Sequence, residues 1–125
     1  MGTQMSNGGH LSHEEYTERQ VQRLLAITKA VHNATLGIVL GSREIARLVR
    51  ALDIQDEQVA RPFIAVDSET DHLPVGPERA HWSTEALAEK DTEIAEYESE
   101  ARERISAAAD DLVRWLESRY EKGNE

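Results

Sequence analysis

The chain has 125 residues and a formal net charge of −10, from 24 acidic and 14 basic residues. This length corresponds to one domain and leaves no room for a cofactor domain beside a substrate domain. The acidic balance argues against binding to nucleic acid or to an anionic membrane, and the lack of cysteine excludes disulfides, thiolate nucleophiles and cysteine-ligated metal centres.

The N-terminal residues 1–11, rich in Gly, Asn and Ser, predict a disordered leader. They lack a charged segment followed by an apolar stretch of roughly 7–15 residues, so we expect no secretory signal. No apolar run approaches the ~18 residues of a membrane span. We therefore expect a cytoplasmic protein that binds no membrane.

Residues 12–38 are predicted to form the first long helix. Ser12 and Glu15 have the spacing of a capping box at its start. An apolar stripe then recurs every three or four positions, as in an amphipathic helix: Val21, Leu24, Leu25, Thr28, Val31, Thr35 and Ile38. A strip of small residues runs beside that stripe and favours close approach of a partner helix: Ala26, Ala30, Ala34, Gly37 and Gly41.

A second, short helix is predicted over residues 42–53. Gly41 suits the position after a helix C-terminus, and Ser42 suits a helix N-cap. Arg43, Arg47 and Arg50 share one face of this helix, because positions i, i+4 and i+7 align. This face has two interpretations: it binds a phosphate-like ligand near the helix N-terminus, or it pairs with carboxylates of the same chain.

Residues 61–82 are predicted to form an ordered loop that packs on the helices. Pro62, Pro74 and Pro77 exclude a long helix here. Residues 63–66, Phe-Ile-Ala-Val, form a short apolar run typical of a strand. The apolar content of the segment argues against disorder.

Acidic and imidazole side chains follow that run closely: Asp67, Glu69, Asp71 and His72. Three carboxylates and one imidazole are suitable ligands for a divalent metal, and in a strand the three acids would share a face. Alternatively, these residues form turn hydrogen bonds while the acids pair with Arg43, Arg47 or Arg79.

Two sequence resemblances involve this region. An apolar strand followed by Asp67-x-Glu69-Thr70 resembles the first motif of DnaQ-like 3′–5′ exonucleases, which implies that Asp67 and Glu69 hold catalytic metals. The mixed sheet and the later acidic motifs of that family are not visible here. Residues 41–76, GSREIARLVRALDIQDEQVARPFIAVDSETDHLPVG, are similar to a family of small bacterial proteins of unknown function, which implies a bacterial cytoplasmic protein without assigning an activity.

Residues 84–120 are predicted to form the last and longest helix, capped by Ser83 or Thr84. From Ile94 to Leu116 its apolar positions repeat with a period of about 3.67 residues, which favours a straight or slightly right-handed helix over a left-handed coiled coil. Such a helix would span about 55 Å, whereas a domain of this size has a radius of gyration near ~14 Å. The helix should therefore extend beyond its own fold, and a second copy of the chain could cover it.

Acidic residues crowd this helix between positions 85 and 103. The spacing of Glu93-x-x-Glu96 and Glu100-x-x-Glu103 resembles that of all-α nucleotide pyrophosphohydrolases, in which helical carboxylates hold Mg²⁺. The alternative is a solvated acidic face, because this spacing arises by chance on a helix rich in Glu.

The sequence thus predicts a mostly α fold with two long helices, one short helix and an ordered loop, assembled by dimerisation into a bundle. The alternative fold is α+β, with residues 38–40 paired against residues 63–66. The leading functional prediction is a non-enzymatic interaction or structural module that acts as a homodimer, with a further protein partner also possible. The alternative is a metal-dependent phosphoesterase that uses the acidic loop, with Arg47 or Arg43 as electrophile.

Overall fold

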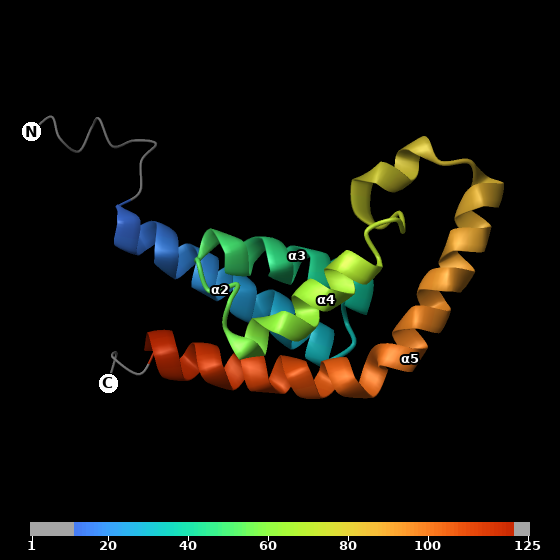
Figure 1. The fold of residues 1–125 in the computed structure, drawn as a ribbon. Coiled ribbons are helices and arrows are strands. Elements are labelled where there is room, and N and C mark those ends of the chain that lie inside the picture. Colours follow the sequence, from blue (N-terminus) through green and yellow to red (C-terminus); the bar gives the residue numbers. More distant parts are fainter. Residues whose placement is uncertain (1–11, 122–125) are drawn as a thin grey trace, which may run out of the picture.

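The computed structural model describes residues 12–121 and contains no strand within that range. Its main helices are α2 (His13–His32), α3 (Ile38–Ala51), α4 (Arg61–Glu69) and α5 (Thr84–Leu116). Two short 3-10 segments, η2 (Gln58–Ala60) and η3 (Gly76–His81), lie between them, and a π-helical turn, η4 (Glu117–Glu121), ends the described chain (Figure 1). The mostly α prediction is confirmed, and the α+β alternative is wrong for these residues. The predicted leader, residues 1–11, lies outside the described residues.

The predicted start of α2 is confirmed. The Ser12 hydroxyl accepts a hydrogen bond from the Glu15 amide at 3.0 Å, and the Glu15 carboxylate accepts one from the Ser12 amide at 3.1 Å. The predicted stripe is buried through Val31. These features follow from residues close together in the chain, so the sequence alone predicts them.

The predicted end of this helix is wrong, because α2 ends at His32 and not near residue 38. Ala34 adopts a left-handed backbone conformation with φ 62°, and the amides of Thr35 and Leu36 both bond to the Ala30 carbonyl. The turn satisfies the end of α2 and releases the following residues to begin α3. Ile38 and Val39 are then completely buried at the start of the new helix.

Gly41 and Ser42 lie inside α3, so their predicted roles as helix end and N-cap are wrong. Gly41 faces α2, where an added Cβ atom would overlap Cγ2 of Val31. The glycine therefore lets two helices approach closely, as the strip of small residues predicted, although it belongs to the second helix. Ser42 is completely buried, and its hydroxyl has no hydrogen-bond partner within residues 12–121.

The predicted strand and the first part of the predicted loop are in fact helix α4. Pro62 occupies the first turn, where a missing amide proton costs no intrahelical hydrogen bond. Phe63, Val66 and Thr70 are buried, and their spacing of three and four residues is helical. Four consecutive apolar residues, 63–66, are too few to distinguish a strand from a segment of buried helix by their pattern. Residues 73–75 of the same segment are buried, in line with the prediction of a packed loop.

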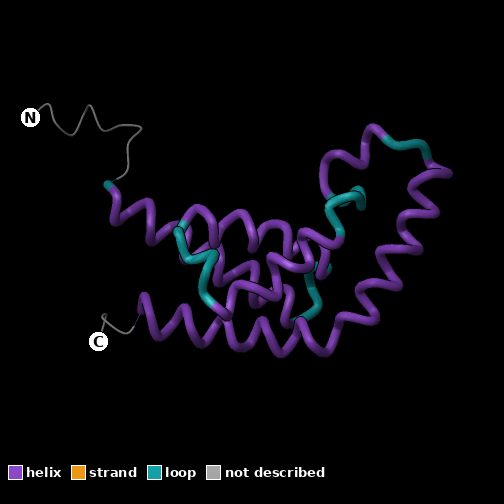
Figure 2. Tube along the Cα trace, viewed as in Figure 1, coloured by secondary structure: helices purple, strands orange, loops and turns teal. Residues whose placement is uncertain are grey.

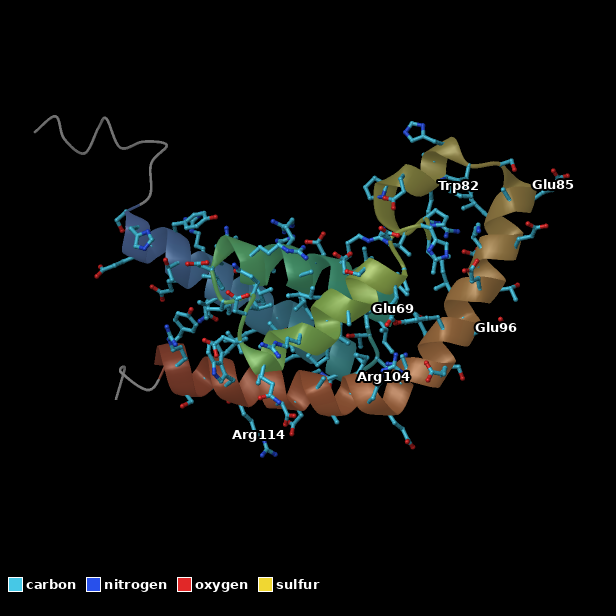
Figure 3. All side chains as sticks on the ribbon, in the orientation of Figure 1. Glu69, Trp82, Glu85, Glu96, Arg104 and Arg114 are labelled. Carbon is cyan, nitrogen blue, oxygen red and sulfur yellow. The ribbon has the colours of Figure 1, made fainter. Side chains whose placement is uncertain are left out.

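The long last helix is confirmed, with Ser83 as its N-cap accepting from the Ala86 amide at 3.1 Å. The prediction that it is straight is wrong. Figure 3 shows Glu96 and Arg104 on either side of a bend in α5. Burial changes at the same place, since Ala101 is the first buried residue of the helix. The second half of α5 packs along α2 and follows the core, whereas the first half leaves it.

The molecule thus has two regions. The body consists of α2, α3, α4 and residues 101–116 of α5, and it holds most of the large buried side chains, among them Leu24, Ile38, Ile45, Leu48, Phe63, Ile105, Leu112 and Leu116. The arm consists of residues 70–100 and projects from the body (Figure 1). Within residues 12–121, no helix is both long and apolar enough to span a membrane.

Candidate functional site

The arm has two limbs, residues 70–83 and residues 84–100 of α5. Figure 2 shows the first limb as turns around the short helix η3 and the second as a continuous helix. No residue of the second limb is buried, although apolar side chains such as Leu87 and Ile94 are half-buried on one side of it. Tyr97 is also half-buried and packs against the core of the body, so this limb has much less apolar packing than the rest of α5 but some at its end.

Ion pairs join the two limbs. Arg79 donates two hydrogen bonds to Asp91, at 2.7 and 3.1 Å, and a third to the carbonyl of Pro74 at 3.2 Å. Nε2 of His72 lies 2.7 Å from a carboxylate oxygen of Glu93. The hydrogen bond from Arg79 lowers the pKa of Asp91, and that from His72 lowers the pKa of Glu93. Both carboxylates are exposed, so we regard these pairs as positioning contacts that contribute little stability.

A hydrogen bond between two side chains joins the second limb of the arm to the end of α4. The Tyr97 hydroxyl donates to Oε1 of Glu69 at 2.6 Å. Burial, reinforced by the carboxylate of Glu69, raises the pKa of Tyr97 to about 12. The phenol therefore keeps its proton at neutral pH and acts as a hydrogen-bond donor.

A second contact joins the arm to the start of α3. Glu98 accepts a hydrogen bond from the Val39 amide at 2.9 Å, across 59 residues of sequence. Gly37 is the N-cap of α3 and has no side chain to cap it, and a Cβ there would lie 2.9 Å from Oε2 of Glu98. A carboxylate from the arm thus takes the place of a local capping residue, where it also interacts favourably with the helix dipole.

Arg43 anchors the first limb. Its guanidinium donates to the carbonyls of Thr70 and Leu73, at 2.8 and 3.3 Å, and to the carboxylate of Glu78 at 2.9 Å. It also lies 3.6 Å from Asp67 of α4. This arginine orders the chain that leaves α4, so it has a structural role in the described residues.

The other predicted arginines also pair with carboxylates. Arg47 bonds to Glu44 at 2.8 Å, and Arg50 lies 3.7 Å from Asp67. Of the two interpretations of this face, the structure therefore shows the carboxylate pairing at all three positions.

The four predicted metal ligands do not come together. Asp67 pairs with arginines of α3, Glu69 accepts from Tyr97, His72 contacts Glu93, and Asp71 is exposed. Among the described residues, no group of three or more carboxylates and imidazoles has the arrangement of a metal site. Asp67 and Glu69 lie on a helix and not after a strand, which corrects the expectation taken from the exonuclease motif.

The acidic residues of α5 are divided between two roles. Glu93 and Glu98 face the rest of the chain, as described above. Glu100 pairs with Arg104 one turn away, at 2.9 and 3.0 Å, and Glu96 is exposed. This distribution fits a solvated acidic face on the outer side of the arm.

Comparison with known proteins gives no direct indication of function. No family model, curated protein or solved structure matches the chain. The resemblance of residues 41–76 to a bacterial family stays a prediction. The residues that connect arm to body, Tyr97 and Glu98, were assigned by the sequence only to an apolar stripe and an acidic face. The sequence carried no signal for Glu98, because residue 37 was expected inside the first helix; only the observed start of α3 at Gly37, without a capping side chain, calls for a partner elsewhere in the chain.

Proposed function

We propose that this protein is a non-enzymatic helical interaction module that acts as a homodimer and binds its partner copy through the outer side of the arm. The observation that carries the proposal is the absence of any buried residue between positions 84 and 100 of α5. Helices in proteins gain most of their stability from an apolar face packed on a partner. A limb with so little of this packing on its own chain is suited to complete its contacts on another molecule.

The polar chemistry of the arm supports a positioning role. Its candidate acid–base groups are engaged with one another, as in the His72–Glu93 and Tyr97–Glu69 contacts. The high pKa of Tyr97 makes the phenol a poor proton donor to a substrate near neutral pH. These contacts fix the direction of the arm and thereby present its outer side.

Sedimentation equilibrium of the full chain over a wide concentration range tests the proposal. We expect a species of twice the 14.1 kDa chain mass that dissociates on dilution. Because exposed charges cover the arm, the dissociation constant should depend on ionic strength. A single 14.1 kDa species at every concentration would contradict homodimerisation.

A further inference from the structure

We propose that the acidic outer side of the arm docks on an arginine surface of α2 and α3 in a second copy, and that the second copy's arm docks reciprocally on the first. This inference rests on the proposed homodimer and names the two surfaces that form it. Reciprocal contact between two different patches closes under two-fold symmetry and forms a dimer instead of an open chain.

The first surface is the acidic stripe, formed by Glu85, Glu89, Glu96 and Glu100. These positions are separated by 4, 7 and 4 residues, so they share one face of α5 over a length of about 22 Å. Glu85, Glu89 and Glu96 are exposed and have no ion pair among the described residues. Figure 3 shows Glu85 and Glu96 on the side of α5 turned away from the body.

The second surface is the arginine surface, formed by Arg23 of α2 with Arg47 and Arg50 of α3. Arg23 and Arg47 converge on one carboxylate of Glu44, at 3.9 and 2.8 Å. The side chains of these three arginines are 59, 54 and 51% exposed, whereas that of Glu44 is 32% exposed.

The arginine surface retains an excess of positive charge after its internal pairs are formed. Arg50 shares the carboxylate of Asp67, which is 21% exposed, with Arg43. Arg43 also pairs with Glu78 at 2.9 Å. Three carboxylates therefore serve four guanidinium groups, and one positive charge remains in excess. The net charge of the chain is −10. On this surface, however, the side chains of Arg23, Arg47 and Arg50 are more exposed than those of Glu44 and Asp67.

The charge of the two surfaces favours a second copy of this chain as the occupant. The stripe cannot reach the arginine surface of its own chain, because the arm carries it away from α2 and α3 (Figure 1). A second copy offers a cationic surface for the stripe and an acidic stripe for the arginines. Repulsion between the two net charges acts over longer distances and is screened beyond ~8 Å at physiological salt, whereas complementary charges in contact are screened less.

Charge reversal on each surface tests this inference. The arm variant is Glu89→Lys with Glu96→Lys, and the body variant is Arg47→Glu with Arg50→Glu. Each variant alone should raise the dimer dissociation constant at least about tenfold in sedimentation velocity, because like charges then meet at both contacts. Circular dichroism of each variant checks that the helices are retained.

Two further samples, in which the substitutions on the two surfaces are combined, show whether a lost dimer results from the changed charges or from general damage to the fold. An equimolar mixture of the arm and body variants should recover the dimer, because each contact again joins opposite charges. A single chain that carries all four substitutions should also recover it. Arg114→Glu, on the side of α5 remote from the arm (Figure 3), is the matched control and should leave the dimer unchanged.

The outcomes separate this inference from the proposed function. A parent dimer that neither variant weakens, or variants whose mixture stays monomeric, overturns the docking surfaces while the homodimer stands. A parent that is monomeric at every concentration overturns both. If such a monomer binds an oligolysine peptide and the arm variant does not, the stripe belongs to a basic protein partner, and the second copy is excluded as its occupant.

Discussion

The two halves of α5 belong to one continuous helix but are held in place by different interactions. Residues 101–116 bury Ile105, Leu112 and Leu116 against the body. Residues 84–100 bury none of their side chains and are held by polar contacts such as Arg79–Asp91 and Tyr97–Glu69. Apolar burial stabilises a helix strongly without fixing its partner, whereas directional hydrogen bonds fix an orientation and add little free energy. The arm is therefore oriented accurately and stabilised weakly.

The largest expected effect on stability comes from replacing a buried isoleucine of α5 with alanine. The same replacement in the arm half of the helix is the comparison. Ile105→Ala should lower the free energy of unfolding by about 2–5 kcal/mol, because it leaves a cavity in the body. Ile94→Ala, in the half-buried position of the arm, should cost about 1 kcal/mol. Urea denaturation followed by circular dichroism measures both. Equal losses would show that the arm is packed as tightly as the body.

A second prediction concerns the closest helix contact of the body. Gly41→Ala should destabilise the protein by about 1–3 kcal/mol, because the new methyl group meets the stiff, fully buried side chain of Val31. The double variant with Val31→Ala should lose less than the sum of the two single variants. If the losses of the two single variants simply add in the double variant, the new methyl group does not act through Val31. The two helices would then have moved apart to accommodate it.

A third prediction tests the contact between arm and body at the start of α3. Glu98→Ala should cost about 1 kcal/mol, since the Val39 amide loses its acceptor and the helix N-terminus loses a nearby negative charge. Glu103→Ala, at an exposed position of the same helix, is the matched control. Hydrogen exchange should speed up at the Val39 amide in the first variant only. Unchanged exchange there would show that solvent caps the helix equally well.

The smallest expected effect is a change in pH dependence. The pKa of Tyr97 lies at about 12 instead of 10.0, so the folded state holds this proton more tightly than the unfolded chain does. The stability from this contact is fully present below pH 10 and is lost as the pH rises through about 12. The difference in phenolate absorbance between the parent and Tyr97→Phe isolates this titration. Glu69→Gln should lower the pKa of Tyr97, and an unchanged value would rule out a contribution from the carboxylate.

Only part of the candidate site could be predicted from patterns in the sequence. The sequence identified the arginines of α3 and the acids of α5 as charged faces, and it left their partners open. It grouped Asp67, Glu69, Asp71 and His72 because they are adjacent in the chain. The structure separates them, because α4 continues to Glu69 and residues two apart on a helix point in different directions.

Local interactions determined the features that the sequence predicted correctly. The Ser12–Glu15 box and the Ser83 cap each act within three residues, and the apolar period of α5 identified its buried face from Ala101 to Leu116. These features need no information about the rest of the fold. They follow from hydrogen bonds and periodicity inside one helix.

Tertiary contacts decided where α3 begins and which structure residues 61–69 adopt. Gly37 can open α3 because Glu98 supplies a cap from 59 residues away, and Gly41 can sit inside that helix because Val31 of α2 needs the space. Helix α4 forms because Phe63 and Val66 find a core on one side. In each case the local sequence permitted more than one structure, and a partner distant in the chain selected one.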